Sequence, residues 1–513
     1  MLKIYRNLKP YIFHIIGIVV LVFLQVLADL YLPTIMSDII NDGIIKENVG
    51  YIMHEGLYML LISGIGAVCA VLASLLSSQV SVGFGRIMRN QVFEHVEGFS
   101  MHEFARFGSS TLITRTTNDV VQIQTATIMI LNFMLRSPIM CIGAVMLAYS
   151  KDKKLTVLLL ETLPVVAVII FIVEKFVMPI FRQVQKKIDK LNLVLRESLT
   201  GIRVIRAFNR EKHEKKRFDT VNGDLTDTYI KVNRIMAFLI PALMMILNIL
   251  IVAILWFGSV RIDAGDMDLG ALIAFLQYAM QILFSLIAMA VMFIMIPRAQ
   301  AAADRIEEVL EVKPEIKDPV YSIPSGKERG YVAFDHVTFR YHGAEEPAVK
   351  DISFTAGPGE TTAIIGGTGS GKTTLVNLIP RFYDVESGRV LVDGIDVHNI
   401  PQKKLRAKIG FVPQKSVLFT GTIADNLRYG KADATKDDVI YAAKIAQADE
   451  FVSSMKDGYN TMLSEGGLNL SGGQKQRLSI ARALVRRPEI YVFDDSFSAL
   501  DFKTDAKLRA ALR

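Results

Sequence analysis

Six apolar stretches, each long enough to cross a lipid bilayer, constrain this chain more than any other feature of its sequence. A bilayer core of about 30 Å is crossed by an α-helix of roughly 20 residues. Backbone polar groups in lipid must be satisfied internally, so such stretches predict transmembrane helices. The stretches are approximately Ile12–Leu32, Leu57–Val80, Ile128–Tyr149, Leu155–Ile172, Ile235–Phe257 and Leu269–Ile296.

The distribution of charge predicts how these helices are oriented. The chain carries a net charge of +7, and much of the basic excess lies in the long gap 173–234, which includes Arg182, Lys186, Lys187, Lys190, Arg196, Arg203, Arg206 and Arg210. The short gap after the first span is acidic, with Asp38, Asp42, Glu47 and Glu55 against Lys46. Basic loops stay in the cytoplasm, so both termini and the long gaps are expected there, in a multi-pass protein of the cell (plasma) membrane. The outer-side residues Lys151, Lys153 and Lys154 run against this rule.

The basic excess is explained without a nucleic-acid partner, and the two cysteines lie in apolar runs that offer neither a disulfide framework nor a zinc site.

The pattern changes after Pro297. Arg298–Val312 reads as an amphipathic helix, Pro314–Gly330 as a linker, and the chain from Tyr331 as a soluble α/β domain. The long gaps 81–127 and 173–234 contain few glycines or prolines, which predicts helices that continue out of the membrane as a stalk. The expected organisation is a transmembrane domain over 1–312, a linker over 313–330 and a second domain over 331–513.

The second domain contains a glycine-rich phosphate loop. Its residues follow a β-like run, Thr361–Ile365, and precede a predicted helix over Thr374–Pro380. The glycines let backbone N–H groups surround phosphates, the lysine supplies a positive charge, and the final threonine offers a hydroxyl to Mg²⁺. A chance glycine-rich turn is the alternative, and the strand–loop–helix context argues against it. The residues of this candidate ATP site are Gly366, Gly367, Thr368, Gly369, Ser370, Gly371, Lys372, Thr373 and Thr374.

Two further motifs follow the phosphate loop in the chain. Glu489–Phe493 is a short apolar strand that ends at Asp494, a candidate Mg²⁺ ligand together with Thr373. Between them lies a second turn with a hydroxyl and two glycines before a helix start: Ser471, Gly472, Gly473 and Gln474. By itself each motif could be an ordinary strand end or helix cap, but their order is specific.

This order resembles the nucleotide-binding domain of ATP-binding-cassette (ABC) proteins, and the whole chain resembles a half-size ABC exporter of the multidrug type. The resemblance implies a multi-domain fold, an all-α six-helix transmembrane domain followed by an α/β P-loop ATPase domain. It implies that Tyr341 stacks on adenine, and that Gln414 contacts Mg²⁺ and the attacking water. Ser498–Asp501 resembles the D-loop, and Arg115–Asp119 and Gly201–Phe208 resemble coupling segments of the cytoplasmic loops.

The resemblance also implies a mechanism and a partner. Two nucleotide-binding domains close head to tail over two ATP molecules, and each ATP lies between one phosphate loop and the other chain's Ser-Gly-Gly-Gln turn. The expected activity is export of amphipathic drugs or lipids by alternating access, coupled to ATP hydrolysis with ATP and Mg²⁺ as cofactors. An ATP-binding regulatory subunit that hydrolyses little, and a peptide or lipid exporter, are the alternatives.

The chain departs from the family pattern at Asp495, where efficient members carry Glu. Asp is shorter by one carbon–carbon bond, about 1.5 Å, and misplacing a general base by that distance can cost on the order of 100-fold in rate. Asp495 could still be a weaker but competent base. The sharper interpretation is a slow site in this chain, paired with a different half transporter in a heterodimer, although a homodimer stays possible.

A second departure concerns the end of the sequence. The family places a switch histidine one strand beyond the helix in which Arg513 lies, and none of the eight histidines fills that place. We therefore expect the chain to be a C-terminally truncated fragment.

Polar residues inside the predicted spans are costly and are often functional. They are Asp29, Arg136, Asn248, Gln277 and Gln281. They could line a substrate cavity or join helices by hydrogen bonds, and the sequence favours neither. Four methionines in the sixth span, Met280, Met289, Met292 and Met295, suit either an adaptable substrate surface or ordinary packing.

Overall fold

The computed structural model describes residues 2–319, 321 and 329–512, and its chain divides into two compact units. The first, here called the helical unit, contains Met1–Phe93 and Ile113–Glu311. The second, here called the mixed unit, contains Glu94–Leu112 and Val312–Arg513. Part of the expected linker, residues 320 and 322–328, lies outside the described residues.

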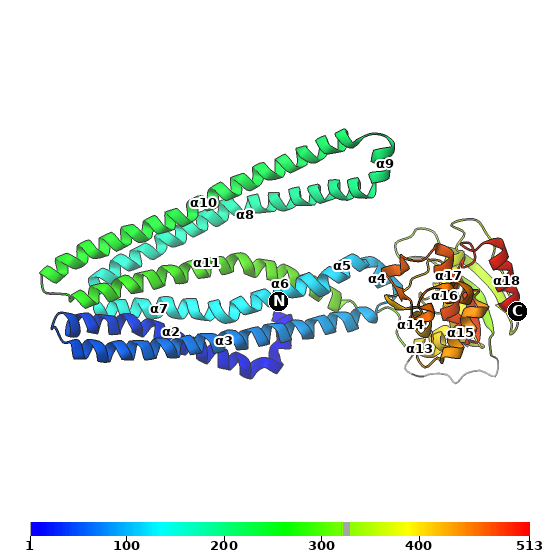
Figure 1. The fold of residues 1–513 in the computed structure, drawn as a ribbon, viewed down its shortest axis with the longest axis horizontal. Coiled ribbons are helices and arrows are strands. Elements are labelled where there is room, and N and C mark those ends of the chain that lie inside the picture. The colour runs from blue at the N-terminus through cyan, green and yellow to red at the C-terminus, as the bar shows by residue number, and fades with distance from the viewer. Residues whose placement is uncertain (1, 320, 322–328, 513) are drawn as a thin grey trace. The chain divides into compact units, whose positions relative to one another are not determined.

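Long helices build the helical unit (Figure 1). They are α2 (Ile12–Asp38), α3 (Val49–Glu97), α7 (Leu135–Lys151), α8 (Lys153–Thr200), α10 (Glu211–Asp263) and α11 (Leu269–Glu311). Short helices complete the connections: α1 (Leu2–Tyr5), α6 (Val120–Met129) and α9 (Ile202–Ala207). Two further short helices follow α3: α4 (Met101–Phe107), which belongs to the mixed unit, and α5 (Ser109–Thr114), in which one unit gives way to the other. α8 and α10 form an antiparallel hairpin with α9 at its tip, and the α9 end diverges from the other helices of the unit.

The predicted spans lie within these helices. Among the described residues, five helical segments are long and apolar enough to cross a membrane: Lys3–Ile44, Val49–Glu97, Ser109–Lys151, Met244–Asp263 and Leu269–Met289. The expected fourth span, Leu155–Ile172, lies in α8 and includes residues 167, 169, 170 and 172, whose side chains lie outside the described part. The prediction that helices continue through the long gaps is confirmed for α3, α8 and α10. Pro297 lies inside α11, so the expected separate helix from Arg298 is instead the last part of one continuous helix.

The core of the helical unit is apolar and is centred on α2, α7 and α11. Tyr278 and Phe275 of α11 are fully buried there, together with Ile18 and Val26 of α2 and Ala144 of α7. Small residues let these helices approach closely: a Cβ on Gly143 would lie 2.4 Å from the Leu30 side chain.

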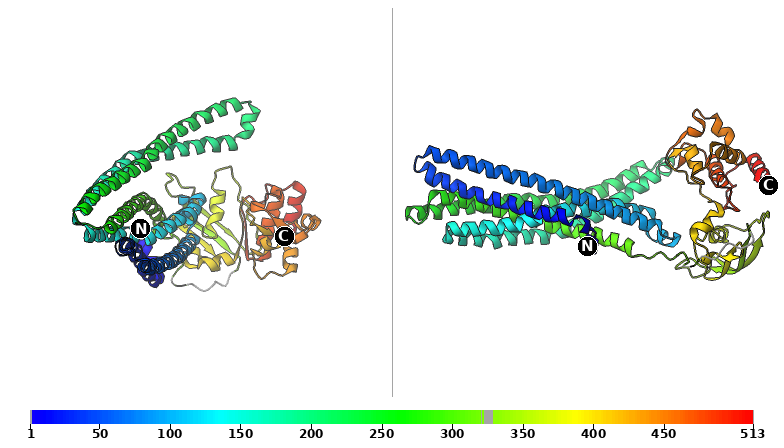
Figure 2. Two further views of the ribbon diagram at one scale, coloured as in Figure 1. Left: turned by 60° about the vertical axis from the view of Figure 1, so that its left-hand side comes forward. Right: turned by 90° about the horizontal axis from the view of Figure 1, so that it is seen from below.

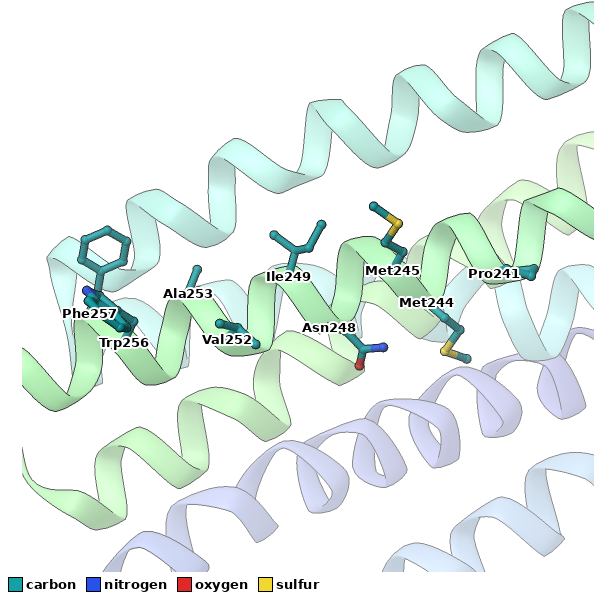
Figure 3. A pocket seen from close by; sticks show the side chains of 9 residues that line it. All are labelled: Pro241, Met244, Met245, Asn248, Ile249, Val252, Ala253, Trp256 and Phe257. Atoms are coloured by element: carbon teal, nitrogen blue, oxygen red, sulfur yellow. The ribbon is translucent and has the colours of Figure 1, made fainter.

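An exposed apolar surface runs along α10 (Figure 3). All of its residues belong to this one helix: Pro241, Met244, Met245, Asn248, Ile249, Val252, Ala253, Trp256 and Phe257. Asn248 is the polar member of the set. The methionines of this surface come from the fifth predicted span rather than from the sixth.

Within its described residues, the mixed unit contains three small sheets. β1 (Val332–Phe339) pairs antiparallel with β2 (Val349–Ala356) and β3 (Ser387–Val392), and β4 (Ile395–Asp396) extends the sheet in the order β2-β1-β3-β4. β5 (Ile409–Val412) pairs parallel with β8 (Ile490–Phe493), with Ile409 opposite Ile490. β6 (Gly421–Thr422) pairs with β7 (Met462–Leu463). The helices of this unit are α4, α12 (Lys372–Leu378), α13 (Gln402–Ala407), α14 (Ile423–Arg428), α15 (Lys436–Ile445), α16 (Asp449–Ser454), α17 (Gly472–Val485) and α18 (Phe502–Leu512).

Two cores divide the mixed unit into lobes, visible in the right-hand view of Figure 2. One core joins the four-stranded sheet to α12 and to the β5–β8 pair, through residues such as Phe334, Leu378 and Val492. The other joins α14, α15, α17 and α18, through residues such as Leu427, Ala443 and Leu508.

The strand expected over Thr361–Ile365 is not formed. These residues have no regular secondary structure, and the Ile365 side chain is 92% exposed. A strand exists only where another strand supplies ladder hydrogen bonds, and here β8 pairs with β5 alone among the described strands. The apolar run in the sequence predicts an extended chain but cannot supply that partner.

Candidate nucleotide-binding site

The phosphate loop lies directly before α12, and its glycines adopt conformations that side chains rarely allow. Gly369 and Gly371 have φ angles of +82° and +86°, and Gly371 is the residue that precedes the first turn of α12. The Lys372 ammonium donates hydrogen bonds to the carbonyl oxygens of Gly366 and Gly367, at 2.8 and 2.7 Å. The lysine charge is therefore held directly over the loop, where the terminal phosphates of a nucleotide would need it.

Thr373 and Asp494 are brought together although 121 residues separate them. The Thr373 hydroxyl donates to Asp494 Oδ1 at 2.9 Å, and Asp494 is buried at the end of β8. Its own N–H donates to the Val412 carbonyl of β5 at 3.0 Å, which fixes the start of the loop after the strand. Two oxygen ligands of one octahedral Mg²⁺ ion lie roughly 3 Å apart. The hydroxyl and carboxylate oxygens therefore suit neighbouring positions around such an ion.

Asp495 and Gln414 also meet. Gln414 Nε2 donates to Asp495 Oδ2 at 3.2 Å, and both residues are exposed. Asp495 has a φ of +47°, a left-handed conformation in which Asp is one of the better tolerated residues. Ser498 Oγ donates to the Asp495 carbonyl at 3.0 Å and holds this turn. The carboxylate predicted to act on water thus lies beside the glutamine predicted to contact it.

Tyr341 is joined to the phosphate-loop helix. Its hydroxyl lies 2.9 Å from Thr374 Oγ1, and its ring packs edge-on against Phe339 and Tyr383, with centroid distances of 4.9 and 5.4 Å. Burial raises the pKa of the Tyr383 hydroxyl, so this residue supports the Tyr341 ring as a neutral phenol. Tyr341 itself keeps 38% of its surface exposed, which leaves ring area for stacking.

The Ser471–Gln474 turn forms the start of α17. Ser471 Oγ accepts from the Gln474 N–H at 3.3 Å, and Gln474 Oε1 accepts from the Ser471 N–H at 2.9 Å, a capping box. A Cβ on Gly473 would lie 3.0 Å from the Ala499 carbonyl oxygen. This turn therefore adjoins the Ser498–Asp501 loop, and Ser471 and Gly472 face outward.

One connection was not assigned from the sequence. Ser416 Oγ donates to Gln476 Oε1 at 2.6 Å, and Gln476 is buried in the first turns of α17. The segment after Gln414 is thereby tied to the helix that begins at the Ser471 turn. The only signal in the sequence was the nearness of Gln476 to Gln474, and adjacency of that kind does not reveal a partner 60 residues away.

The long gap 81–127, which was expected to be cytoplasmic, divides between the two units. The segment grouped with the mixed unit is Glu94–Leu112, which contains α4. Arg115–Asp119, expected to be a coupling segment, belongs to the helical unit, where Arg115 and Asp119 are buried and form ion pairs with Glu308 and Arg305 of α11.

Comparisons with known proteins agree with this arrangement. Residues 15–286 match the ABC transporter transmembrane region, and residues 349–498 match the ABC transporter family of ATP-binding domains. An uncharacterised ABC transporter ATP-binding protein of Mycobacterium tuberculosis (strain ATCC 25618 / H37Rv) is 44% identical over 99% of this chain and 88% of its own length. A fatty acid ABC transporter ATP-binding/permease protein of Mycobacterium bovis is 32% identical over 83% of this chain and 67% of its own length.

More distant similarities extend over nearly the whole chain. An ATP-dependent lipid A-core flippase of Chromobacterium violaceum is 29% identical over 99% of this chain and 88% of its own length. The solved structure of a bacterial Atm1-family ABC exporter with ATP bound has the same fold, with a TM-score of 0.80 at 24% identity over 98% of this chain and 88% of that one. The long-helix unit, the phosphate loop with its Asp494 partner and these similarities lead to one conclusion: the chain belongs to the ABC transporter family, as a half transporter in which a transmembrane region is fused to an ATPase domain that drives transport.

Proposed function

We propose that this chain forms one half of a heterodimeric exporter that moves amphipathic small molecules, drugs or lipids, out of the cytoplasm. Its own phosphate loop binds Mg-ATP and turns it over slowly, while its Ser471–Gln474 turn serves the ATP of the partner half transporter. The termini and the ATPase domain are cytoplasmic, and the membrane is the cell membrane. The proposed division is a transmembrane domain over 1–312, a linker over 313–330 and an ATPase domain over 331–513.

The observation that carries the slow-site proposal is the position of Asp495. Its carboxylate is engaged with Gln414 at 3.2 Å, directly after the metal-binding Asp494. A glutamate at the same backbone position would extend the carboxylate by about 1.5 Å. Positioned Mg²⁺ would supply charge stabilisation at the phosphates, and Thr373, Asp494 and Gln414 are the residues that would hold it. By this proposal the site has the groups that bind Mg-ATP, but the Asp495 carboxylate is too short to reach the attacking water.

The lipid-like part of the proposal is supported by the relatives. The names of two of them specify fatty acid and lipid A-core as substrates. The exposed apolar surface of α10, which includes Met244, Met245 and Trp256, is adaptable because methionine side chains are flexible.

The experiment measures ATP hydrolysis by the chain alone and with a co-expressed partner half transporter, in lipid nanodiscs. We expect feeble turnover alone and strong turnover in the complex. Asp495→Glu should raise turnover at this chain's own site, by up to about 100-fold if reach is the defect. Lys372→Ala is the matched control, because it removes the phosphate-binding charge. It should abolish ATP binding at this site both in the chain alone and in the complex.

Strong turnover by the wild-type chain alone would contradict the heterodimer. A flat response to Asp495→Glu, with ATP binding intact, would show that a feature other than the length of this side chain limits hydrolysis. A complex that binds ATP, changes conformation and never turns it over would favour the alternative, a regulatory subunit.

A further inference from the structure

Three of the polar residues in the predicted spans come together in the helical unit, from three different helices. Arg136 of α7 donates from Nη2 to Asp29 Oδ2 of α2 at 3.0 Å. Gln281 of α11 donates from Nε2 to the Asp29 carbonyl oxygen at 3.1 Å. Arg136 and Gln281 lie 107 and 252 residues from Asp29 in the chain, so the sequence did not reveal this cluster.

The cluster lies at membrane depth. Asp29 precedes Ser37 by eight residues of one helix, which corresponds to about 12 Å. Ser37 lies level with the end of α7, where the predicted span ends, because Lys151 donates to its hydroxyl at 3.4 Å. An arginine or aspartate in the middle of a transmembrane helix costs about 2.5–3.5 kcal/mol on insertion scales, so such residues face protein or a water-filled path.

The Asp29–Arg136 pair is partly exposed and leaves some of its hydrogen-bonding groups unused. Arg136 and Asp29 keep 41% and 29% of their side-chain surface exposed. Within the described part of the chain, Nε and Nη1 of Arg136 make no hydrogen bond, and the buried Oε1 of Gln281 accepts none. The Arg261–Asp152 pair of the same unit is different: its side chains are 19% and 3% exposed, and Asp152 also caps α8 by accepting from the Leu155 N–H. That pair has the character of a structural contact, and the Asp29–Arg136 pair does not.

We propose that Arg136 recognises the anionic head group of the transported amphiphile, a carboxylate or a phosphate, and that Asp29 is the internal counter-ion which this head group replaces. A guanidinium presents a planar fork that binds such oxygens in pairs, and here two of its nitrogens make no hydrogen bond to the described residues. The inference deepens the proposed export of amphiphiles, on which it rests, by assigning the substrate a negative charge.

The two charged residues then have effects of opposite sign, which a structural ion pair would not show. Arg136→Gln removes the anion-binding group and should raise the half-maximal concentration of an anionic substrate about tenfold or more. Asp29→Asn removes the competing anion and should lower that concentration. If the pair served stability alone, both substitutions would impair the protein in the same way.

The test uses the complete transporter, with its partner, in nanodiscs of neutral lipid. The measurement is stimulation of ATP hydrolysis by amphiphiles of matched chain length: oleate and oleyl phosphate as anions, oleyl alcohol as the neutral probe, and oleylamine as the cation. Lys151→Gln is the matched control, because it removes one positive charge from the same helix at its outer end. We expect oleate and oleyl phosphate to lose potency in Arg136→Gln, oleyl alcohol to keep its potency, and the Lys151→Gln variant to behave as wild type.

Each outcome decides one question. If no amphiphile stimulates the wild-type transporter, the proposed export of amphiphiles fails, whatever Arg136 does. If the anions stimulate wild type and Arg136→Gln equally, the assignment of Arg136 is overturned. If Arg136→Gln does not fold, the double variant Asp29→Asn/Arg136→Gln removes both charges together. Retained anion preference in that variant would likewise overturn the proposal, and its loss with stimulation by oleyl alcohol preserved would support it.

Discussion

Gly371 shows how one residue of the phosphate loop depends on having no side chain. Its φ is +86°, and a Cβ there would lie 2.6 Å from the Ala348 carbonyl oxygen and 2.7 Å from Val349 Cγ1. Two separate costs therefore fall on any larger residue, a left-handed backbone and a collision with the chain that precedes β2. Gly367, four residues earlier, has neither problem: a Cβ there would meet no atom within 4 Å.

We predict that Gly371→Ala lowers the free energy of unfolding of the ATPase domain by about 2 kcal/mol, through backbone strain and the contact with Ala348. Gly367→Ala should leave it nearly unchanged. The measurement is the apparent unfolding midpoint without nucleotide, which keeps effects on phosphate binding out of the comparison. Equal midpoints for the two variants would show that the loop relaxes around the added methyl group.

At the scale of elements, the β3–β4 hairpin and the turn that follows it contain a titratable pair. His398 Nδ1 lies 2.8 Å from Asp396 Oδ1, and its Nε2 lies 3.3 Å from Asp384 Oδ1. The hydrogen bond to Asp396, with the charges of Asp384 and Asp396, raises the pKa of His398 above its ordinary value of 6.5, while Arg381 and burial oppose the shift. The folded chain therefore holds this proton more tightly than the unfolded chain does.

Because the pKa of His398 is raised in the folded chain, its protonation stabilises the fold. This stabilisation is fully present at pH values below 6.5 and is lost as the pH rises through the folded-state pKa. We predict that His398→Gln lowers the unfolding midpoint most at about pH 6 and progressively less at higher pH. The measurement is the difference in midpoint between wild type and His398→Gln across pH 5.5 to about 9. A difference that stays constant over this range would mean that the imidazole contributes by packing rather than by its charge.

At the scale of the whole molecule, an ion pair near the end of α11 joins two distant segments of the helical unit. Arg305 donates to both oxygens of Asp119, from Nε at 2.8 Å and from Nη2 at 2.5 Å. Asp119 is almost fully buried, with 4% of its side chain exposed, while Arg305 is half exposed. This pair joins residues 186 positions apart and fixes the segment Arg115–Asp119 against α11.

We predict that Arg305→Gln lowers the stability of the helical unit by about 2 kcal/mol, because it leaves a buried carboxylate without its cation. The double variant Asp119→Asn/Arg305→Gln should recover most of the loss, since it removes the uncompensated charge. The measurement is a thermal double-mutant cycle in detergent, with Asp119→Asn as the second single variant. Additive losses in the double variant would contradict a direct charge interaction.

The sequence by itself determined those features of this protein that depend on the residues of one short segment. The length of each apolar stretch required membrane helices, because no other structure satisfies the backbone in lipid. The spacing of glycines, lysine and threonine in Gly366–Thr373 identified a phosphate loop, because those groups act on one ligand from one short segment. The family, the ATPase activity and most of the candidate nucleotide-binding residues followed from these patterns.

Only the tertiary structure decided which distant residues meet. Thr373 with Asp494, Gln414 with Asp495, and Arg136 with Asp29 and Gln281 are each joined across more than 80 residues. The apolar run Thr361–Ile365 looked like a strand but lacks a partner strand, while Pro297 looked like a boundary but lies within α11. Hydropathy and motif spacing describe what a segment can form by itself. Strand pairing, ion pairs and buried polar clusters depend on neighbours that only the folded chain supplies.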